Sequence, residues 1–330
     1  MAVDIDLAKP SGKPWISGRW LAVLGIALLA AFPLAVHDSY WIHLMILSMM
    51  WAALATSWNL LCGYAGIFNM GQQAFFGLGA YVSALLAMNA GVSPWFGMWI
   101  GGAAAAAVSL VIAVPTLRLR AAPYVAIATL GFAEVSRIVA QNLVDLTRGE
   151  LGLNGIPGMP AITLGGLTIN FYARPPFYYL MLVLFVVILL VVYKLIHSPF
   201  GMALKSMRES PDAAESLGVN IVRFKIVVFA ISAAMAGVVG AFYAHYIQVL
   251  TPSSALALPL MVEIIAITLI GGLGTIIGPV IGAFVLTIGL EYLRFLGDYR
   301  MLLYGLVLVP LIMFTPEGLV KRVLPRRLTS

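Results

Sequence analysis

Three side-chain amides within an apolar stretch are the first candidates for chemistry in this sequence. Asn69, Gln72 and Gln73 lie in GYAGIFNMGQQAFFGLGAY, residues 63–81, where five glycines weaken a continuous helix. Backbone that leaves a helix at membrane depth has to lie in protein or along a water-filled cavity, because lipid offers no hydrogen bonds. Free backbone groups and amides can bind a zwitterion without a fixed charge. The stretch therefore predicts a substrate pathway that contains Asn69, Gly71, Gln72 and Gln73. The alternative is that its glycines only allow helices to pack closely.

A second apolar stretch is interrupted in the same way. It reads IGGLGTIIGPVIGAF, residues 270–284, and glycines, a threonine and a proline break its apolar run. The pattern predicts a second broken helix, with Gly272, Gly274 and Thr275 along the same pathway. Close packing of helices is again the alternative reading.

Charged residues inside apolar segments are a third kind of candidate, because an isolated charge in a bilayer is costly. Glu134 and Arg137 in TLGFAEVSR are three residues apart, so they share one face of a helix and can pair. We expect a structural ion pair, although such charges can also mark a functional site. Glu263 is the lone acid of another apolar segment. It either lines the pathway or bonds to a neighbouring helix.

The longest polar island is SPFGMALKSMRESPDAAESLGVN, residues 198–220. Ser198 and Ser210, each followed by a proline, are typical helix starts, and Gly218 is a typical helix end. The island therefore predicts two short helices with a charged side and an apolar side. Such a segment could dock on a soluble partner, or it could be a solvated loop.

Enzyme signatures are absent from the sequence. The four histidines are scattered, and no HExxH, GxSxG or GxxxxGK[ST] motif occurs. The single cysteine, Cys62, excludes an internal disulfide and a cysteine metal cluster. We expect no metal, no catalytic residue and no ATP hydrolysis by this chain itself.

The composition indicates the elements that must position these residues. The chain is 62% hydrophobic and 10% charged, far from the balance of a soluble domain. It predicts an all-α, polytopic transmembrane helical bundle with broken helices, since a span needs about 20 mostly apolar residues. About ten spans are expected, roughly at 20–36, 41–61, 68–90, 95–115, 122–142, 177–195, 221–248, 257–271, 276–294 and 300–316.

Lysine and arginine positions predict the orientation. With ten spans, fourteen of the 19 lysines and arginines fall on one side, four on the other, and Arg137 within a span. Positive charge collects on the cytoplasmic side, so the net charge of +6 points to a membrane rather than to nucleic acid. We expect a cytoplasmic tail at 1–19, a permease domain at 20–320 and a basic cytoplasmic tail at 321–330. Two halves of opposite orientation would suit an inverted repeat, although the sequence shows no self-similarity.

The longest external loop, residues 143–176, contains LTRGELGLNGIPG. Its glycines and Pro157 favour a shaped turn over a helix. The loop could contact a partner on the outer face or simply connect two spans.

Several of these motifs together resemble one known family. The chain resembles the permease subunits of the high-affinity branched-chain amino acid ABC importers, and in particular the LivM-type members. The resemblance covers most of residues 51–319. It is carried by GYAGIFNMGQQAFFGLGAY, RLRAAPYVAIATLGFAEVSRI, SPFGMALKSMRESPDAAESLGVN with KIVVFAISAAMAGVVGAFYA, LIGGLGTIIGPVIGA and TPEGL.

The resemblance implies a five-part importer in a bacterial inner membrane. This permease would pair with a second, homologous permease, two ATP-binding cassette subunits and a periplasmic solute-binding protein, and would pass an amino acid through the lipid bilayer. ATP would bind only to the partner subunits, so no cofactor is expected here. Residues 198–220 would be the coupling segment. Its residues for the contact with the ATPase would be Arg208, Glu209, Asp212, Ala213, Ala214, Glu215 and Gly218.

Departures from the family pattern leave the substrate open. Gln72 stands where histidine is frequent, and Thr147 to Glu150 interrupts the outer-loop motif. Urea, short amides or aromatic acids are alternative substrates. An ATP-independent channel or facilitator is an alternative from another class, and a membrane enzyme is disfavoured because no catalytic constellation is present.

Overall fold

Helices make up nearly all of the described structure. The computed structural model describes residues 18–116, 122–164, 167–171 and 173–292, together with Gly305 and Gly318. The α-helices are α1 (Gly18–Ala35), α2 (Ser39–Asn59), α3 (Gln72–Asn89), α4 (Pro94–Thr116), α5 (Ala122–Asn142), α6 (Val144–Thr147), α7 (Arg174–Ile196), α8 (Pro199–Glu209), α9 (Pro211–Ser216), α10 (Ile221–Ile247), α11 (Pro252–Ala255), α12 (Leu258–Gly271) and α13 (Gly278–Tyr292).

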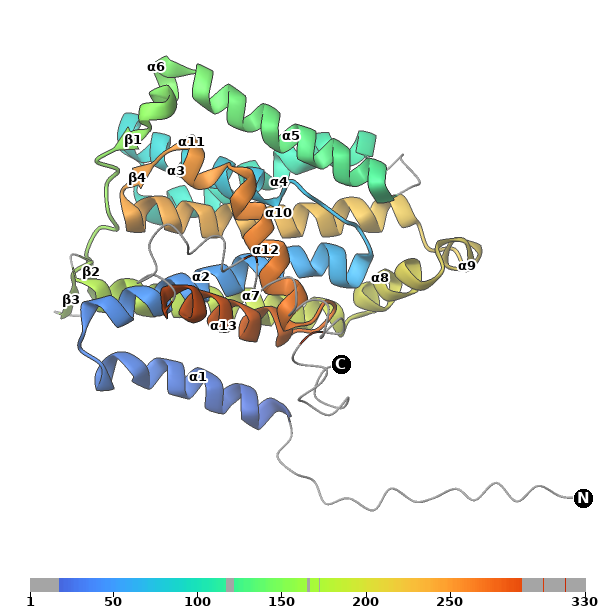
Figure 1. Cartoon of the computed structure of the whole chain (residues 1–330), viewed down its shortest axis with the longest axis horizontal. Coiled ribbons are helices and arrows are strands. Elements are labelled where there is room, and N and C mark those ends of the chain that lie inside the picture. Colours follow the sequence, from blue (N-terminus) through green and yellow to red (C-terminus); the bar gives the residue numbers. More distant parts are fainter. Residues whose placement is uncertain are drawn as a thin grey trace, which may run out of the picture.

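Short elements lie at both ends of the bundle. A π-helix, η1 (Leu60–Tyr64), extends α2, and a 3-10 turn, η2 (Gly149–Leu151), follows α6. Strand β1 (Leu153–Asn154) pairs antiparallel with β4 (Val249–Leu250), and β2 (Ile162–Leu164) pairs antiparallel with β3 (Leu167–Ile169). The strands lie at one end of the long helices, and α8 and α9 lie at the other (Figure 1).

The all-α prediction is confirmed for the described residues. Six of their helical segments are long and apolar enough to cross a membrane, and α1 and α13 contain shorter apolar helices. Most of the expected spans up to residue 294 lie close to an observed helix. The expected span at 68–90 is wrong at its start, because α3 begins only at Gln72 after a non-helical stretch. The expected span at 300–316 and both terminal tails lie outside the described residues, Gly305 excepted.

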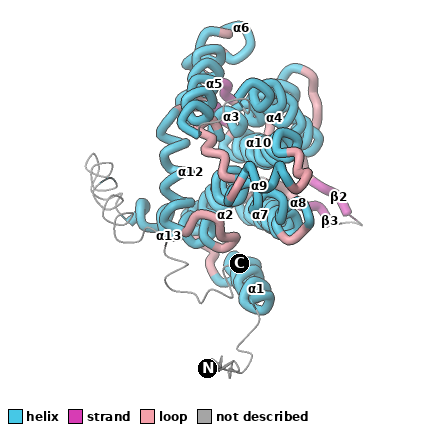
Figure 2. The backbone as a smooth tube through the Cα atoms, turned by 90° about the vertical axis from the view of Figure 1, so that its right-hand side faces the viewer, coloured by secondary structure: helices cyan, strands magenta, loops and turns pink. Residues whose placement is uncertain are grey.

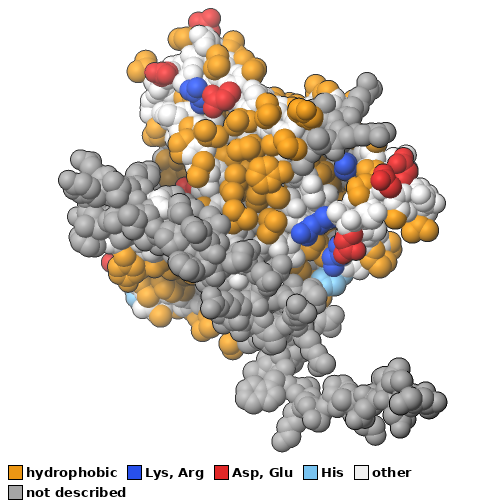
Figure 3. Space-filling model, turned by 45° about the vertical axis from the view of Figure 1, so that its right-hand side comes forward, with side chains coloured by type: hydrophobic (Ala, Val, Ile, Leu, Met, Phe, Trp, Pro, Cys, Tyr) orange, Lys and Arg blue, Asp and Glu red, His pale blue; other side chains and the backbone are white. Residues whose placement is uncertain are grey.

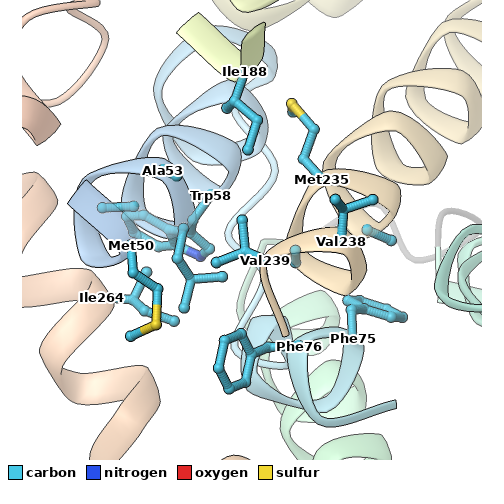
Figure 4. Close-up of a cluster of buried hydrophobic side chains, with 14 of the residues drawn as sticks. Met50, Ala53, Trp58, Phe75, Phe76, Ile188, Met235, Val238, Val239 and Ile264 are labelled. Carbon is cyan, nitrogen blue, oxygen red and sulfur yellow. The ribbon is translucent and has the colours of Figure 1, made fainter. Parts of the chain in front are cut away.

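Helices α2, α3, α7 and α10 surround the core, and α12 crosses them at a steep angle (Figure 2). Trp58 of α2, Phe75 and Phe76 of α3, and Val239 of α10 meet in a dry cluster (Figure 4). All four side chains are at most 1% exposed. Large aromatic and branched side chains therefore fill the centre of the bundle.

Glycines bring α3 and α10 into backbone contact. A Cβ added at Gly79 would collide with the backbone of Gly237, and a Cβ added at Gly240 would collide with the carbonyl of Phe76. Small residues at helix interfaces allow this close approach in membranes. The glycines of α3 at Gly77 and Gly79 therefore serve packing, the alternative considered for them above.

Replacing Gly79 with alanine is expected to lower the melting temperature of the purified protein, because overpacking of a close helix contact costs about 1–3 kcal/mol. Gly131→Ala on α5 is the matched control, since an added Cβ there meets no atom within 4 Å. Thermal unfolding of both variants in detergent tests the difference. Equal melting temperatures would contradict the close contact of α3 with α10.

Candidate functional site

The first helix break lies between α2 and α3 and is held by buried amides. After η1, residues 66–71 leave the helix. The Asn69 Nδ2 donates to Gln72 Oε1 at 2.9 Å, and the Asn69 Oδ1 accepts from the Gly71 amide at 2.9 Å. Gln72 Nε2 donates to the hydroxyls of Ser57 at 2.9 Å and Ser232 at 3.1 Å. These bonds join the break to α2 and α10.

The second break, between α12 and α13, is joined to the first by Asn59. Its Nδ2 donates to the Thr275 carbonyl at 2.8 Å, and its Oδ1 accepts from the Gly274 amide at 2.8 Å. Thr275 Oγ1 donates to the Gly272 carbonyl at 2.7 Å and accepts from the Gly278 amide at 3.1 Å, so it caps α13. The two glycine-rich stretches, which are about 200 residues apart in the sequence, therefore form one unit.

Asn59 was missed in the sequence because it precedes the glycine-rich motif and looks like an isolated polar residue at a helix end. It is 1% exposed, and its partners are 215 and 216 residues further along the chain. The glycine of TPEGL also reaches this unit. A Cβ added at Gly318 would collide with the backbone of Gly272, whose φ of 124° favours glycine.

The predicted pathway residues therefore lie together, but most of them are bonded within the chain. Asn69, Gln72 and Gln73 are 0% exposed, and Thr275 is 1% exposed. Asn69, Gln72 and Thr275 have internal hydrogen-bond partners, so they stabilise the breaks. Gln73 differs, because both polar atoms of its amide are buried without a partner among the described residues. An unsatisfied buried amide costs about 1–3 kcal/mol, which makes Gln73 the free polar group of this set.

A pocket of about 310 Å³ lies where α8 meets the two breaks. The Arg208 guanidinium of α8 donates a hydrogen bond to the carbonyl of Gly63 in η1. A Cβ added at Gly274 would lie 3.1 Å from Arg208 Nη1. Basic and acidic side chains gather at the α8–α9 end of the molecule (Figure 3). The lining residues are Tyr64, Lys205, Arg208, Glu209 and Gly274.

The polar island forms the two predicted helices. Ser198 caps α8, as its Oγ accepts from the Gly201 amide at 3.4 Å, and Pro199 follows in the first turn. Ser210 occupies the same position before α9, but its side chain makes no capping bond, contrary to the expected cap. Gly218 ends the segment with a φ of 86°.

The apolar side of the island is divided between two environments. Met207 and Ala214 are 2% exposed and pack inward, whereas Met202 is 64% and Leu217 is 83% exposed. A largely exposed leucine on a charged helix pair is a candidate contact for another protein. Of the residues predicted to couple to an ATPase, Asp212, Ala213, Glu215 and Gly218 are exposed and Ala214 is not.

The predicted ion pair on α5 is confirmed. Arg137 Nη2 lies 2.8 Å from Glu134 Oε2, and Arg137 Nε donates to the same oxygen at 2.9 Å. About a third of each side chain is exposed, 30% for arginine and 34% for glutamate. Glu263 is partly buried on α12.

A buried histidine holds the outer loop at the opposite end. His245 of α10 lies 2.8 Å from the Ser83 hydroxyl through Nε2 and 2.7 Å from the Pro157 carbonyl through Nδ1. The expected shaped turn is present in part. Arg148 lies in the left-handed region at φ 59°, but α6 extends to Thr147 and η2 is a single turn of 3-10 helix. No group of three potential metal ligands occurs among the residues described.

Comparisons with known proteins agree with the resemblance seen in the sequence. The family model described as branched-chain amino acid transport system / permease component matches residues 40–312. The chain is 32% identical over 322 residues to the high-affinity branched-chain amino acid transport system permease protein LivM of Escherichia coli (strain K12), covering 91% of this chain and 74% of the relative.

Other relatives are similar at different levels. The LivM protein of Salmonella typhimurium is 32% identical over 93% of this chain and 75% of its own length. The nucleoside ABC transporter permease protein NupC of Lactococcus lactis is 27% identical over 56% of this chain and 60% of its own. No solved structure matches the chain significantly.

Proposed function

We propose a specific task for this chain from the premise that it belongs to the branched-chain amino acid transport permease family. The chain is a permease subunit of an ABC importer and a multi-pass inner membrane protein. Its task would be to form half of a translocation pathway for branched-chain or related amino acids. The two joined helix breaks would open and close this pathway.

One observation carries the proposal. Arg208 belongs to the polar island, yet its guanidinium bonds the carbonyl of Gly63 at the first break and lies beside Gly274 at the second. A partner that moves α8 would therefore move both breaks together. Because a ligand or partner shifts a two-state equilibrium only by its differential affinity for the states, this contact has to differ between them.

The family implies a complex with other subunits. We propose a second homologous permease, two ATP-binding subunits and a periplasmic solute-binding protein as those partners. Helices α8 and α9 would be the coupling segment for the ATP-binding subunits, which alone would hydrolyse ATP. The outer loop held by His245 would face the solute-binding protein.

The charge distribution supports an orientation with α8 and α9 in the cytoplasm, since fourteen of 19 lysines and arginines fall on that side of a ten-span arrangement. Both termini would then be cytoplasmic. The two breaks, one in each half of the chain, would suit an inverted repeat. Gln73 would be the amide that meets the solute, whereas Asn69, Gly71, Gln72, Gly272, Gly274 and Thr275 would shape the pathway around it.

Uptake of labelled leucine, isoleucine and valine tests the proposal in proteoliposomes that hold the complete importer with its binding protein. ATP-dependent accumulation of at least one of these solutes is the expected result. Similarity to a nucleoside permease favours nucleosides as a second substrate class to include. Equilibration of the solute across the bilayer without ATP would instead support a facilitator, and no transport of any amino acid would overturn the proposal.

A further inference from the structure

The ion pair on α5 lies on the least covered of the six span-length helical segments. Only 28% of the Pro123–Asn142 segment is buried inside the chain, against 83% for Ser39–Tyr64. Helix α5 lies at the edge of the bundle in both views (Figures 1 and 2). Glu134 is twelve residues from the start of α5, which is about 18 Å along the axis and near the middle of a bilayer. Lipid is a poor cover for two charges at that depth.

Among the described residues, the bond of the pair joins no two elements of the fold. Glu134 and Arg137 are three residues apart on the same helix, so their bond adds no tertiary contact. A helix in a membrane already satisfies its backbone and needs no such support. A purely structural role therefore leaves the position of the two charges unexplained, whereas a polar pathway beside α5 explains it.

Glu134 keeps one carboxylate oxygen and Arg137 keeps three of its five N–H donors outside their mutual bond. Both arginine contacts, from Nε and Nη2, go to the single oxygen Oε2 of Glu134. Among the described residues, Arg137 Nη1 and Glu134 Oε1 have no hydrogen-bond partner. A free carboxylate oxygen accepts from an ammonium group, and a guanidinium nitrogen donates to a carboxylate. An α-amino acid carries these two groups side by side.

The same helix contacts the first break. The Met70 amide donates to Thr129 Oγ1 at 2.9 Å, and a Cβ added at Gly71 would lie 2.6 Å from the Thr129 carbonyl. Phe132 stacks on Phe75 of α3 with ring centroids 5.7 Å apart. A solute bound one turn further along α5 would therefore act on the helix break through the contacts of Thr129 and Phe132.

We infer that Glu134 and Arg137 form a receptor for the ammonium and carboxylate groups of a zwitterionic amino acid in a water-filled pathway beside α5. This inference rests on the proposed function and names the binding site within it. The ammonium group of the solute would lie beside Glu134 and its carboxylate beside Arg137. Its side chain would point away from α5.

A variant with both charges removed tests the receptor. Glu134→Gln with Arg137→Met leaves no unpaired charge, so a merely structural pair predicts unchanged insertion and unchanged uptake. The receptor predicts intact assembly and about tenfold or more slower uptake at low amino-acid concentration, with the loss mainly in KM. Ile138→Ala, which alters an exposed apolar neighbour, is the control for the helix surface.

Equal uptake by wild type and the double variant would overturn the inference alone. A wild-type importer without amino-acid uptake would overturn the proposed function and the inference together.

Cysteine labelling provides a readout besides transport. The sequence has one cysteine, Cys62, which is replaced by alanine in the parent. Glu134→Gln with Arg137→Cys in this parent should react with a membrane-impermeant thiol reagent in the assembled importer. A thiol that does not react in any nucleotide state would mean that α5 faces lipid or a dry interface, and it would overturn the inference.

Discussion

Replacing Leu217 with glutamate is expected to abolish both co-purification of the ATP-binding subunits and ATP-driven uptake. Leu217 follows α9 and is 83% exposed, next to the exposed polar residues Glu215 and Ser216. Burial of a leucine side chain in a pocket on a partner stabilises the complex by about 2 kcal/mol or more. A buried glutamate would reverse the sign of that contribution, because an unpaired charge in an interface is strongly unfavourable. Affinity purification from cells that express the whole importer measures the loss.

Leu151→Glu is the matched control for this variant. Leu151 has the same type and the same exposed fraction, 83%, but lies in η2 at the opposite end of the helices. It should leave the ATP-binding subunits bound. The Leu217 variant should also insert in the membrane at the wild-type level, since no packed contact is lost. Normal retention of the ATP-binding subunits by Leu217→Glu would contradict the assignment of α8 and α9 as the coupling segment.

Local patterns in the sequence predicted the features that local chemistry determines. Ser198 with Pro199 predicted the start of α8, and the spacing of Glu134 and Arg137 predicted their bond. Helical periods and caps depend on residues within one or two turns, so the chain itself contains the information.

Features that depend on distant pairs could not be predicted in this way. The partner of Arg208 is a backbone carbonyl 145 residues earlier, and Asn59 bonds to residues more than 200 positions later. A backbone carbonyl has no sequence signature. For the same reason, the amphipathic pattern of the island could not separate Ala214, which packs inward, from Leu217, which points out.

The pathway assignment shows a related limit. Amides at membrane depth suggest a polar channel, but a broken helix also needs partners for its own freed backbone groups. Asn69 and Asn59 satisfy that second need, because Asn69 accepts from the Gly71 amide and Asn59 bonds the backbone of Gly274 and Thr275. Burial and hydrogen bonding distinguish the two roles, and within the described part of the chain Gln73 is the amide of this set without a partner.

Replacing Arg208 with alanine is expected to separate ATP hydrolysis from transport. The variant loses the bond from the guanidinium to the carbonyl of Gly63, the contact that joins α8 to the first helix break. A hydrogen bond to a charged group contributes about 1.5–3 kcal/mol, which is about 10- to 150-fold in the balance between two pathway states. ATP-binding subunits should still bind, because Leu217 is unchanged. Uptake should therefore fall by at least about tenfold while ATP hydrolysis continues.

Lys205→Ala is the matched control, because Lys205 lines the same pocket but makes no hydrogen bond to either break among the described residues. Arg208→Lys should restore part of the uptake, since an ammonium keeps the charge but not the planar fork that reaches the carbonyl. Parallel measurement of ATP hydrolysis and leucine uptake in proteoliposomes separates the three variants. A proportional fall of both rates in Arg208→Ala would mean that the guanidinium supports docking rather than the movement of the helix breaks. Unchanged rates would mean that α8 transmits its motion through other contacts, such as the buried side chains of Leu204 and Met207.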